Sequence, residues 1–155
     1  MPVAWRIVKK KYAAAAFDGE GARLYGGRWT RVGQAAVYAA GSVSLATLEI
    51  VAHLGYDRSL LVNAFSLFEV DIPEDLVLIV DPKTLPARWM ASPPPPELWT
   101  VGDGWLDAKL KPVFRVPSAI VQTEFNYLLN PRHPDFRKLS IGDEQPYAFD
   151  SQLLP

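Results

Sequence analysis

The chain has 155 residues, 49% of them hydrophobic and 21% charged, and its formal net charge is −1. These values are typical of one soluble globular domain, and they give no overall positive field that would attract nucleic acid or an anionic membrane. The absence of cysteine excludes disulfides, thiolate metal sites and cysteine nucleophiles. We therefore expect a single cytoplasmic domain over residues 1–155, with no metal site and no membrane-spanning segment.

The N-terminal third is predicted to contain one firm helix among short strands. In chain order we expect a strand, a short helix or loop, a mobile turn and a buried strand, at residues 5–8, 13–16, 18–21 and 35–40. The firm helix spans residues 44–54, because Ser42 or Ser44 can cap its start and Gly55 can end it. This helix is apolar on most sides, so we expect it to be mostly buried.

The rest of the chain is predicted to consist of strands and loops. The expected strands lie at residues 62–72, 76–80, 113–121, 139–141 and 147–149, and the second of these is the more buried. We expect residues 88–104 to form a loop, in which the proline-rich residues 92–96 are extended and outside any helix. Many strands with one firm helix favour the α+β class.

Residues 23–29, Arg-Leu-Tyr-Gly-Gly-Arg-Trp, form a candidate binding turn. Gly26 and Gly27 carry no Cβ, so the backbone can bend there and a ligand can approach it closely. Arg28 offers a planar fork of donors suited to phosphate, and the rings of Tyr25 and Trp29 offer faces for stacking. A pocket for a phosphorylated, ring-containing ligand would need these groups, but a plain turn with aromatic side chains packed beside it explains the same residues.

Glu49 is a candidate catalytic group because it lies in the middle of the firm helix among apolar neighbours. A carboxylate in such surroundings costs several kcal/mol unless it is paired. Two structural explanations compete with a catalytic one. Glu49 could form a buried ion pair with an arginine, or it could lie on a narrow exposed strip beside His53.

Ser118 is a hydroxyl in an otherwise apolar strand, directly after Pro117. A serine satisfied by the local bend would explain it. A serine hydrolase is disfavoured, because the Gly-x-Ser-x-Gly motif is absent and neither His53 nor His133 has an evident orienting acid.

An ordered set of segments resembles the RES domain family, which is named for an arginine, a glutamate and a serine. The segments are Trp5-Arg6, Gly26-Gly27-Arg28-Trp29, Val37-Tyr38-Ala39-Ala40, Ser44-Leu45-Ala46-Thr47-Leu48-Glu49, Val116-Pro117-Ser118-Ala119, Asn126-Tyr127-Leu128-Leu129-Asn130-Pro131 and Phe149-Asp150. Each segment alone is a weak signal, but together they cover nearly the whole chain in order and with compatible spacing.

The resemblance implies a bacterial toxin whose partner is an antitoxin with an Xre-type helix-turn-helix, in a complex where the toxin could also form homo-oligomers. It implies an ADP-ribosyltransferase-like mixed β core flanked by short helices, and NAD+ as the substrate. The name-giving residues would be Arg28, Glu49 and Ser118, and Arg6 and Tyr38 match further positions that line the NAD+ pocket. The toxin itself is not expected to bind nucleic acid.

Cleavage of the nicotinamide–ribose bond would suit these residue types. The reaction passes through an oxocarbenium-like state, which Glu49 could stabilise while it accepts a hydrogen bond from a ribose hydroxyl. Arg28, with Arg6, would clamp the pyrophosphate, and Tyr38 could stack on the nicotinamide ring. Ser118 would hydrogen-bond the ribose or position Glu49 or Arg28.

Two other functions are consistent with the sequence. The domain could transfer ADP-ribose to a specific cellular protein instead of releasing it to water or phosphate. Alternatively, it could be a non-enzymatic module that presents Pro93 to Pro96 as a polyproline ligand.

Overall fold

The computed structural model describes residues 1–55 and 57–154. Its strands are β1 (Val3–Lys9), β2 (Val37–Ala40), β3 (Phe65–Asp71), β4 (Val77–Ile79), β5 (Val113–Pro117), β6 (Phe125–Leu129), β7 (Ser140–Ile141) and β8 (Gln145–Tyr147). Its α-helices are α1 (Glu20–Tyr25), α2 (Val43–Leu54), α3 (Ser59–Val62) and α4 (Glu97–Ala108), and 3-10 helices lie at Lys10–Ala15, Glu74–Leu76, Pro82–Thr84, Pro134–Lys138 and Ser151–Leu153. None of the helices in these two stretches is both long and apolar enough to cross a bilayer.

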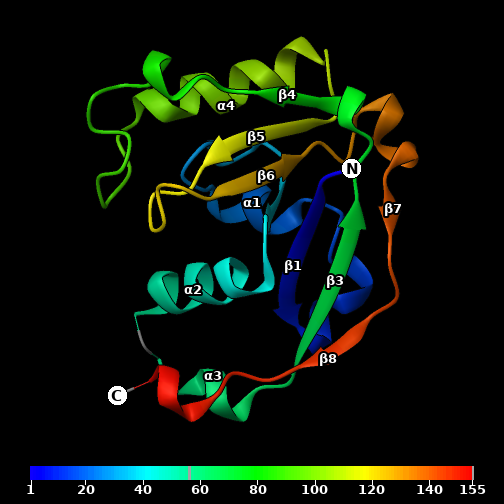
Figure 1. Ribbon diagram of the computed structural model, residues 1–155, viewed down its shortest axis with the longest axis vertical. Helices are drawn as coiled ribbons and strands as arrows, with labels where there is room; N and C mark the ends of the chain where they lie inside the picture. The colour runs from blue at the N-terminus through cyan, green and yellow to red at the C-terminus, as the bar shows by residue number, and fades with distance from the viewer. Residues whose placement is uncertain (56, 155) are drawn as a thin grey trace.

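The strands join in one mixed, curled sheet in the order β4-β5-β6-β2-β1-β3-β7, and β8 also pairs with β3. The pair β4–β5 is parallel, and the others are antiparallel. Only Trp5 and Ala40 are in register between β1 and β2, and the sheet bends at this junction, so that β1 and β3 run steeply across the direction of β5 and β6 (Figure 1). A mixed sheet with a few helices confirms the α+β prediction.

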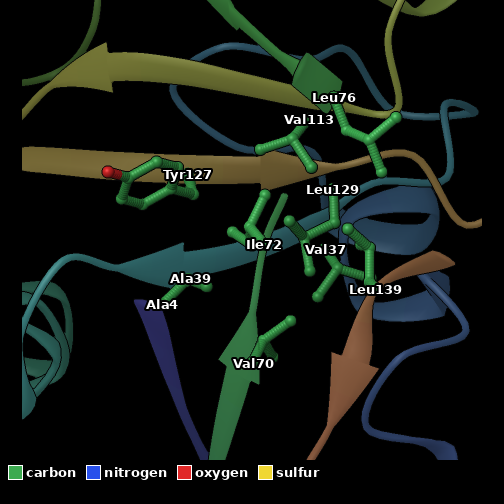
Figure 2. Packing of buried hydrophobic residues seen from close by; sticks show 10 residues of the cluster. All are labelled: Ala4, Val37, Ala39, Val70, Ile72, Leu76, Val113, Tyr127, Leu129 and Leu139. Atoms are coloured by element: carbon green, nitrogen blue, oxygen red, sulfur yellow. The ribbon is translucent and has the colours of Figure 1, made fainter. Parts of the chain in front are cut away.

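One face of the sheet carries a continuous apolar core. Leu129 on β6 lies between Val113 on β5 and Val37 on β2, so these three side chains project from the same face. Figure 2 shows them in one cluster with residues from β1 and β3 and from the segments around them. The buried members are Ala4, Val37, Ala39, Val70, Ile72, Leu76, Val113, Tyr127, Leu129 and Leu139.

The opposite face carries two separate apolar clusters. The cluster under α4 contains Trp29, Ala36, Leu98, Trp105, Leu106, Phe114, Val116 and Leu128. The cluster under α2 contains Ile7, Ala40, Leu45, Ala46, Val51, Leu60, Phe65, Leu67, Phe149 and Leu154. The two helices lie apart along this face, and the loop between β5 and β6 reaches toward α2 (Figure 1). A seam therefore separates the two clusters.

Helix α2 confirms the predicted helix at residues 44–54. The Ser42 hydroxyl accepts a hydrogen bond from the backbone N–H of Leu45 at 3.0 Å, and Gly55 ends the helix with φ +62°. The prediction that this helix is mostly buried was only half right. Leu45, Ala46, Thr47 and Val51 are buried, but the side chains of Leu48 and Leu54 are each 40% exposed.

The sequence prediction was wrong for residues 88–104, because their second half belongs to α4. Pro96 already has helical backbone angles, φ −59° and ψ −24°, and it is the cap residue of this helix rather than extended chain. Proline fits at a helix start because no intrahelical partner is needed for its missing N–H. Gly102 lies inside α4, where a Cβ would come within 2.7 Å of the Trp29 carbonyl carbon.

Three further predictions need correction. The expected mobile turn at residues 18–21 is the start of α1, which begins at Glu20 after Gly19. The predicted buried strand at residues 76–80 is the edge strand β4, in which Ile79 is 56% exposed. Strand β6 was not predicted, although it lies near the centre of the sheet.

Candidate functional site

The Glu49 carboxylate lies at the seam between the two clusters. Its Oε1 atom accepts hydrogen bonds from Ser118 Oγ at 2.9 Å and from Asn126 Nδ2 at 2.8 Å. No ion pair to Glu49 forms within residues 1–55 and 57–154, so the predicted alternative of a buried ion pair is wrong. Helix α2 supplies the carboxylate, and the strand pair β5–β6 supplies both donors.

Ser118 is fully buried, and the hydrogen bonds of its hydroxyl are all used. The backbone N–H groups of Ile120 and Val121 both donate to Ser118 Oγ at 3.1 Å, which occupies its two lone pairs. Because a hydroxyl has a single proton, that proton must point to Glu49 Oε1. The bend after β5 and the orientation of the carboxylate therefore depend on the same hydroxyl.

Asn126 is a site residue that the sequence reasoning did not select. It lies on β6, in register with Val116 on one side and Ala40 on the other, one residue from each of the two apolar clusters. Its Nδ2 donates to Glu49, while its Oδ1 is buried and has no hydrogen-bond partner in the described part of the chain. The segment Asn126 to Pro131 carries part of the family resemblance, and this was the available signal.

The two glycines of the turn each have a structural reason. Gly26 ends α1 with φ +70°, a backbone angle that favours glycine. At Gly27, a Cβ would lie 2.6 Å from Tyr38 Cζ, so only glycine lets the phenol pack against the backbone. The Tyr38 hydroxyl also accepts a hydrogen bond from Trp29 N at 3.1 Å and bonds Thr30 Oγ1 at 2.8 Å.

The aromatic neighbours of the turn separate. Trp29 is 2% exposed and belongs to the cluster under α4, whereas Tyr25 is 84% exposed. Burial raises the pKa of Tyr38 to about 12, so its phenol stays neutral throughout the physiological range.

Arg28 reaches the segment between β4 and α4. Its Nη1 donates to the carbonyl oxygens of Trp89 at 3.0 Å and Ala91 at 2.9 Å. Burial lowers the pKa of this half-buried guanidinium, and the charge of Glu49 partly offsets that effect. Arg28 and Glu49 are therefore electrostatic neighbours, although they make no ion pair.

Arg6 lies on the other face of the sheet. It is in register with Phe68, whose ring contacts Phe17 beside the continuous core, whereas its neighbour Trp5 aligns with Ala40 on the face of Glu49. Its Nε donates to the Ala16 carbonyl at 2.6 Å and its Nη1 to the Tyr38 carbonyl at 2.8 Å. Burial lowers the pKa of Arg6 to about 10, which still leaves it charged at neutral pH.

The structure thus brings together four of the five predicted site residues, Arg28, Tyr38, Glu49 and Ser118, and adds Asn126. It does not bring the Arg6 guanidinium to the Glu49 carboxylate. Arg6 instead contacts the site through the backbone of Tyr38, and its place in a ligand pocket stays a prediction.

A shallow hollow lies beside the site, along the outer segment that Arg28 binds. Its lining runs from Pro86 through the prolines to Glu97 and includes Ala91, but it does not include Glu49. The site therefore offers one oriented carboxylate with a nearby guanidinium.

Comparisons with known proteins agree on one family. The RES domain matches residues 3–150. A protein of Photorhabdus laumondii subsp. laumondii named "Toxin Res" is 40% identical over 153 residues, which is 98% of this chain and 97% of that protein. A protein of Sphingobium sp. named "Prs ADP-ribosylating toxin" is 35% identical over 155 residues, which is 97% of this chain and 95% of that protein.

A solved structure with a similar fold is that of the M. tuberculosis MbcT–MbcA toxin–antitoxin complex. The TM-score is 0.78 at 19% identity, and the alignment covers 94% of this chain and 84% of that one. The family match spans both the α2 carboxylate and the strand pair that orients it. The chain belongs to the RES domain family.

Proposed function

We propose that this protein is the toxin of a toxin–antitoxin pair and that it cleaves the nicotinamide–ribose bond of NAD+. The observation that carries the proposal is the Glu49 carboxylate, with one oxygen fixed by two donors and a guanidinium as its electrostatic neighbour. The names of the relatives support it, since they describe RES toxins and one ADP-ribosylating toxin. Depletion of cellular NAD+ would arrest growth.

Glu49 would act on the ribose next to the bond that breaks. As that C–N bond breaks, its electron pair leaves with the nicotinamide ring nitrogen, and positive charge develops on the ribose. Glu49 Oε2 would accept a hydrogen bond from a ribose hydroxyl and stabilise that charge. Nicotinamide leaves as a neutral molecule, so a single carboxylate can suffice without a second group as general acid.

Arg28 would bind the pyrophosphate. A guanidinium has several N–H donors, which suits it to two adjacent phosphate groups. The hydrogen bonds from Arg28 to the carbonyls of Trp89 and Ala91 both come from its Nη1 atom. The ring of Tyr38 would stack on nicotinamide while its hydroxyl stays bound to Thr30. Ser118 would act through Glu49, because its only proton is already donated to that carboxylate.

The acceptor of the ADP-ribose group distinguishes two forms of this activity. Water or phosphate would release a free nucleotide product, whereas a protein acceptor would become modified, as the name of the Sphingobium relative describes for that protein. Labelled NAD+ incubated with the protein and a cell lysate separates the two outcomes, because label bound to a protein indicates transfer. We propose a cytoplasmic location and an Xre-type antitoxin as partner.

Substitution of Glu49 tests the proposed chemistry. Glu49→Gln keeps an oxygen that can accept from Ser118 and Asn126, but it removes the charge, and we expect nicotinamide release to fall by about 100- to 1,000-fold. Glu124→Gln is the matched control, since this exposed carboxylate lies on the adjacent β5–β6 loop and bonds Ser42. Release at the wild-type rate by a folded Glu49→Gln variant would refute the mechanism.

A further inference from the structure

We propose that Asn126 is a positioning residue that gives the two oxygens of Glu49 different roles. This inference rests on the proposed NAD+ cleavage. Asn126 and Ser118 both donate to Oε1, and no residue in the described stretches donates to Oε2. Oε1 is thereby anchored to the strand pair, and Oε2 is left to accept a hydrogen bond from the substrate.

The place of Asn126 in the sheet explains how it reaches Glu49. Asn126 is the second residue of β6, in register with Val116, and Ser118 follows two residues after Val116. On the other side Asn126 is in register with Ala40, whose strand leads through Gly41 and Ser42 into α2. The Asn126 amide therefore lies between the end of β5, which leads to Ser118, and the end of β2, which leads into α2. Its hydrogen bond to Glu49 links α2 to β6.

The orientation of the Asn126 amide has only one solution. An ionised carboxylate can only accept hydrogen bonds, so the NH2 group of the amide must face Glu49. Its Oδ1 is then forced into a buried position where it has no partner among residues 1–55 and 57–154. Burial of an unsatisfied acceptor lowers stability, and a leucine of similar volume would avoid that loss. The amide at position 126 is therefore explained by its hydrogen bond to Glu49 and not by packing.

The titratable groups around Glu49 lie on the turn, on α2 itself and on the β5–β6 loop. Arg28 on the turn is its cationic neighbour, His53 follows one helical turn later on the exposed side of α2, and Glu124 lies on the β5–β6 loop. Tyr38 on β2 stays neutral because burial raises its pKa to about 12. A second carboxyl group at position 126 would be the one closest to Glu49, so its ionisation would dominate any change in pH dependence.

The test compares three variants by their pH profiles of NAD+ cleavage. Asn126→Leu removes the donor at similar volume, and we expect kcat to fall about 10- to 100-fold with KM changed less. Asn126→Asp restores a donor only while one proton is shared between the two carboxyls, so its activity should survive at acidic pH and fall as the pair loses that proton at higher pH. Asn130→Asp is the matched control, because Asn130 is a buried amide just beyond the same strand whose Oδ1 accepts from Arg132 N.

A measurement without substrate separates this inference from the proposed function. We expect the 13C carboxyl resonance of Glu49 to titrate at a higher pH in Asn126→Asp than in the wild type, and at the wild-type pH in Asn130→Asp. An unchanged titration together with an unchanged pH profile in Asn126→Asp would overturn the positioning role. If the wild type released no nicotinamide but the titration shifted as expected, the proposed function would fail and the hydrogen bond would stand.

Discussion

The two faces of the sheet differ in how their apolar residues are arranged. On one face, ten buried side chains form a single cluster across the sheet (Figure 2). On the other face, the buried apolar residues are divided between α2 and α4, and the polar contacts of Glu49, Ser118 and Asn126 lie at the seam. The comparison shows that the continuous face can supply stability, while the interrupted face holds the polar groups of the candidate site.

The largest expected effect on stability lies on the continuous face. Leu129→Ala would leave a cavity at a fully buried position, so we expect the free energy of unfolding to fall by about 2–5 kcal/mol. Leu78→Ala on the edge strand β4 is the control, because its side chain is 36% exposed. Denaturant unfolding of both variants measures the difference, and equal losses would contradict the role of this cluster.

On the interrupted face, Arg28→Ala should change binding more than stability. Loss of the guanidinium removes charge-assisted bonds to the pyrophosphate, so we expect KM for NAD+ to rise about 10- to 100-fold. Arg23→Ala is the control, since Arg23 pairs with Glu20 on the surface of α1. Steady-state kinetics measure the change in KM. An unchanged KM in Arg28→Ala would show that Arg28 does not bind the pyrophosphate.

A smaller effect is expected at the contact between the turn and β2. In Gly27→Ala the added Cβ would displace the phenol of Tyr38, and we expect stability to fall by about 1–3 kcal/mol. The double variant with Tyr38→Phe should lose less than the sum of the two single changes, because the hydroxyl is the group displaced. Gly104→Ala, where a Cβ would meet nothing within 4 Å, is the control. Additive losses in the cycle would argue against this contact.

The smallest expected effect is a titration at high pH. Since the pKa of Tyr38 is raised to about 12, the unfolded chain loses this proton first, and stability from the neutral phenol is full below pH 10 and lost as the pH rises toward 12. The pKa of Arg6, lowered to about 10, acts in the opposite direction, so wild type must be compared with Tyr38→Phe at each pH. An absorbance step near pH 10 that disappears in Tyr38→Phe would disprove the shift.

Local signals explain which elements could be predicted from the sequence. The ends of α2 were predictable because the hydrogen bond of Ser42 to Leu45 N and the backbone angle of Gly55 depend on residues that are close in sequence. Helix α4 was not, because Gly102 is unfavourable in a helix and is required only by the close approach of Trp29. Strand β6 is flanked by partners on both sides and buried over Tyr127 to Leu129, so it shows no polar alternation.

The candidate site was predictable as a set of residue types but not as a geometry. Glu49 and Ser118 are 69 positions apart, and only the register of β5 with β6 brings the serine and Asn126 to the same carboxylate oxygen. Arg6 shows the converse: a residue that matched the family pattern faces the other side of the sheet, because it immediately follows Trp5 on β1.

The hydroxyl of Ser118 has a consequence for genetic screens. It shapes the chain after β5 through Ile120 and Val121 and also holds Glu49. In a collection of loss-of-function alleles, changes at Ser118 will therefore combine a folding defect with a catalytic one, whereas Glu49→Gln, which keeps an accepting oxygen, will accumulate as stable inactive protein. Measuring protein abundance together with activity separates the two groups of alleles. At position 118, threonine keeps both the donor and the lone pairs of the hydroxyl, so it is the replacement most compatible with shaping the chain and holding Glu49.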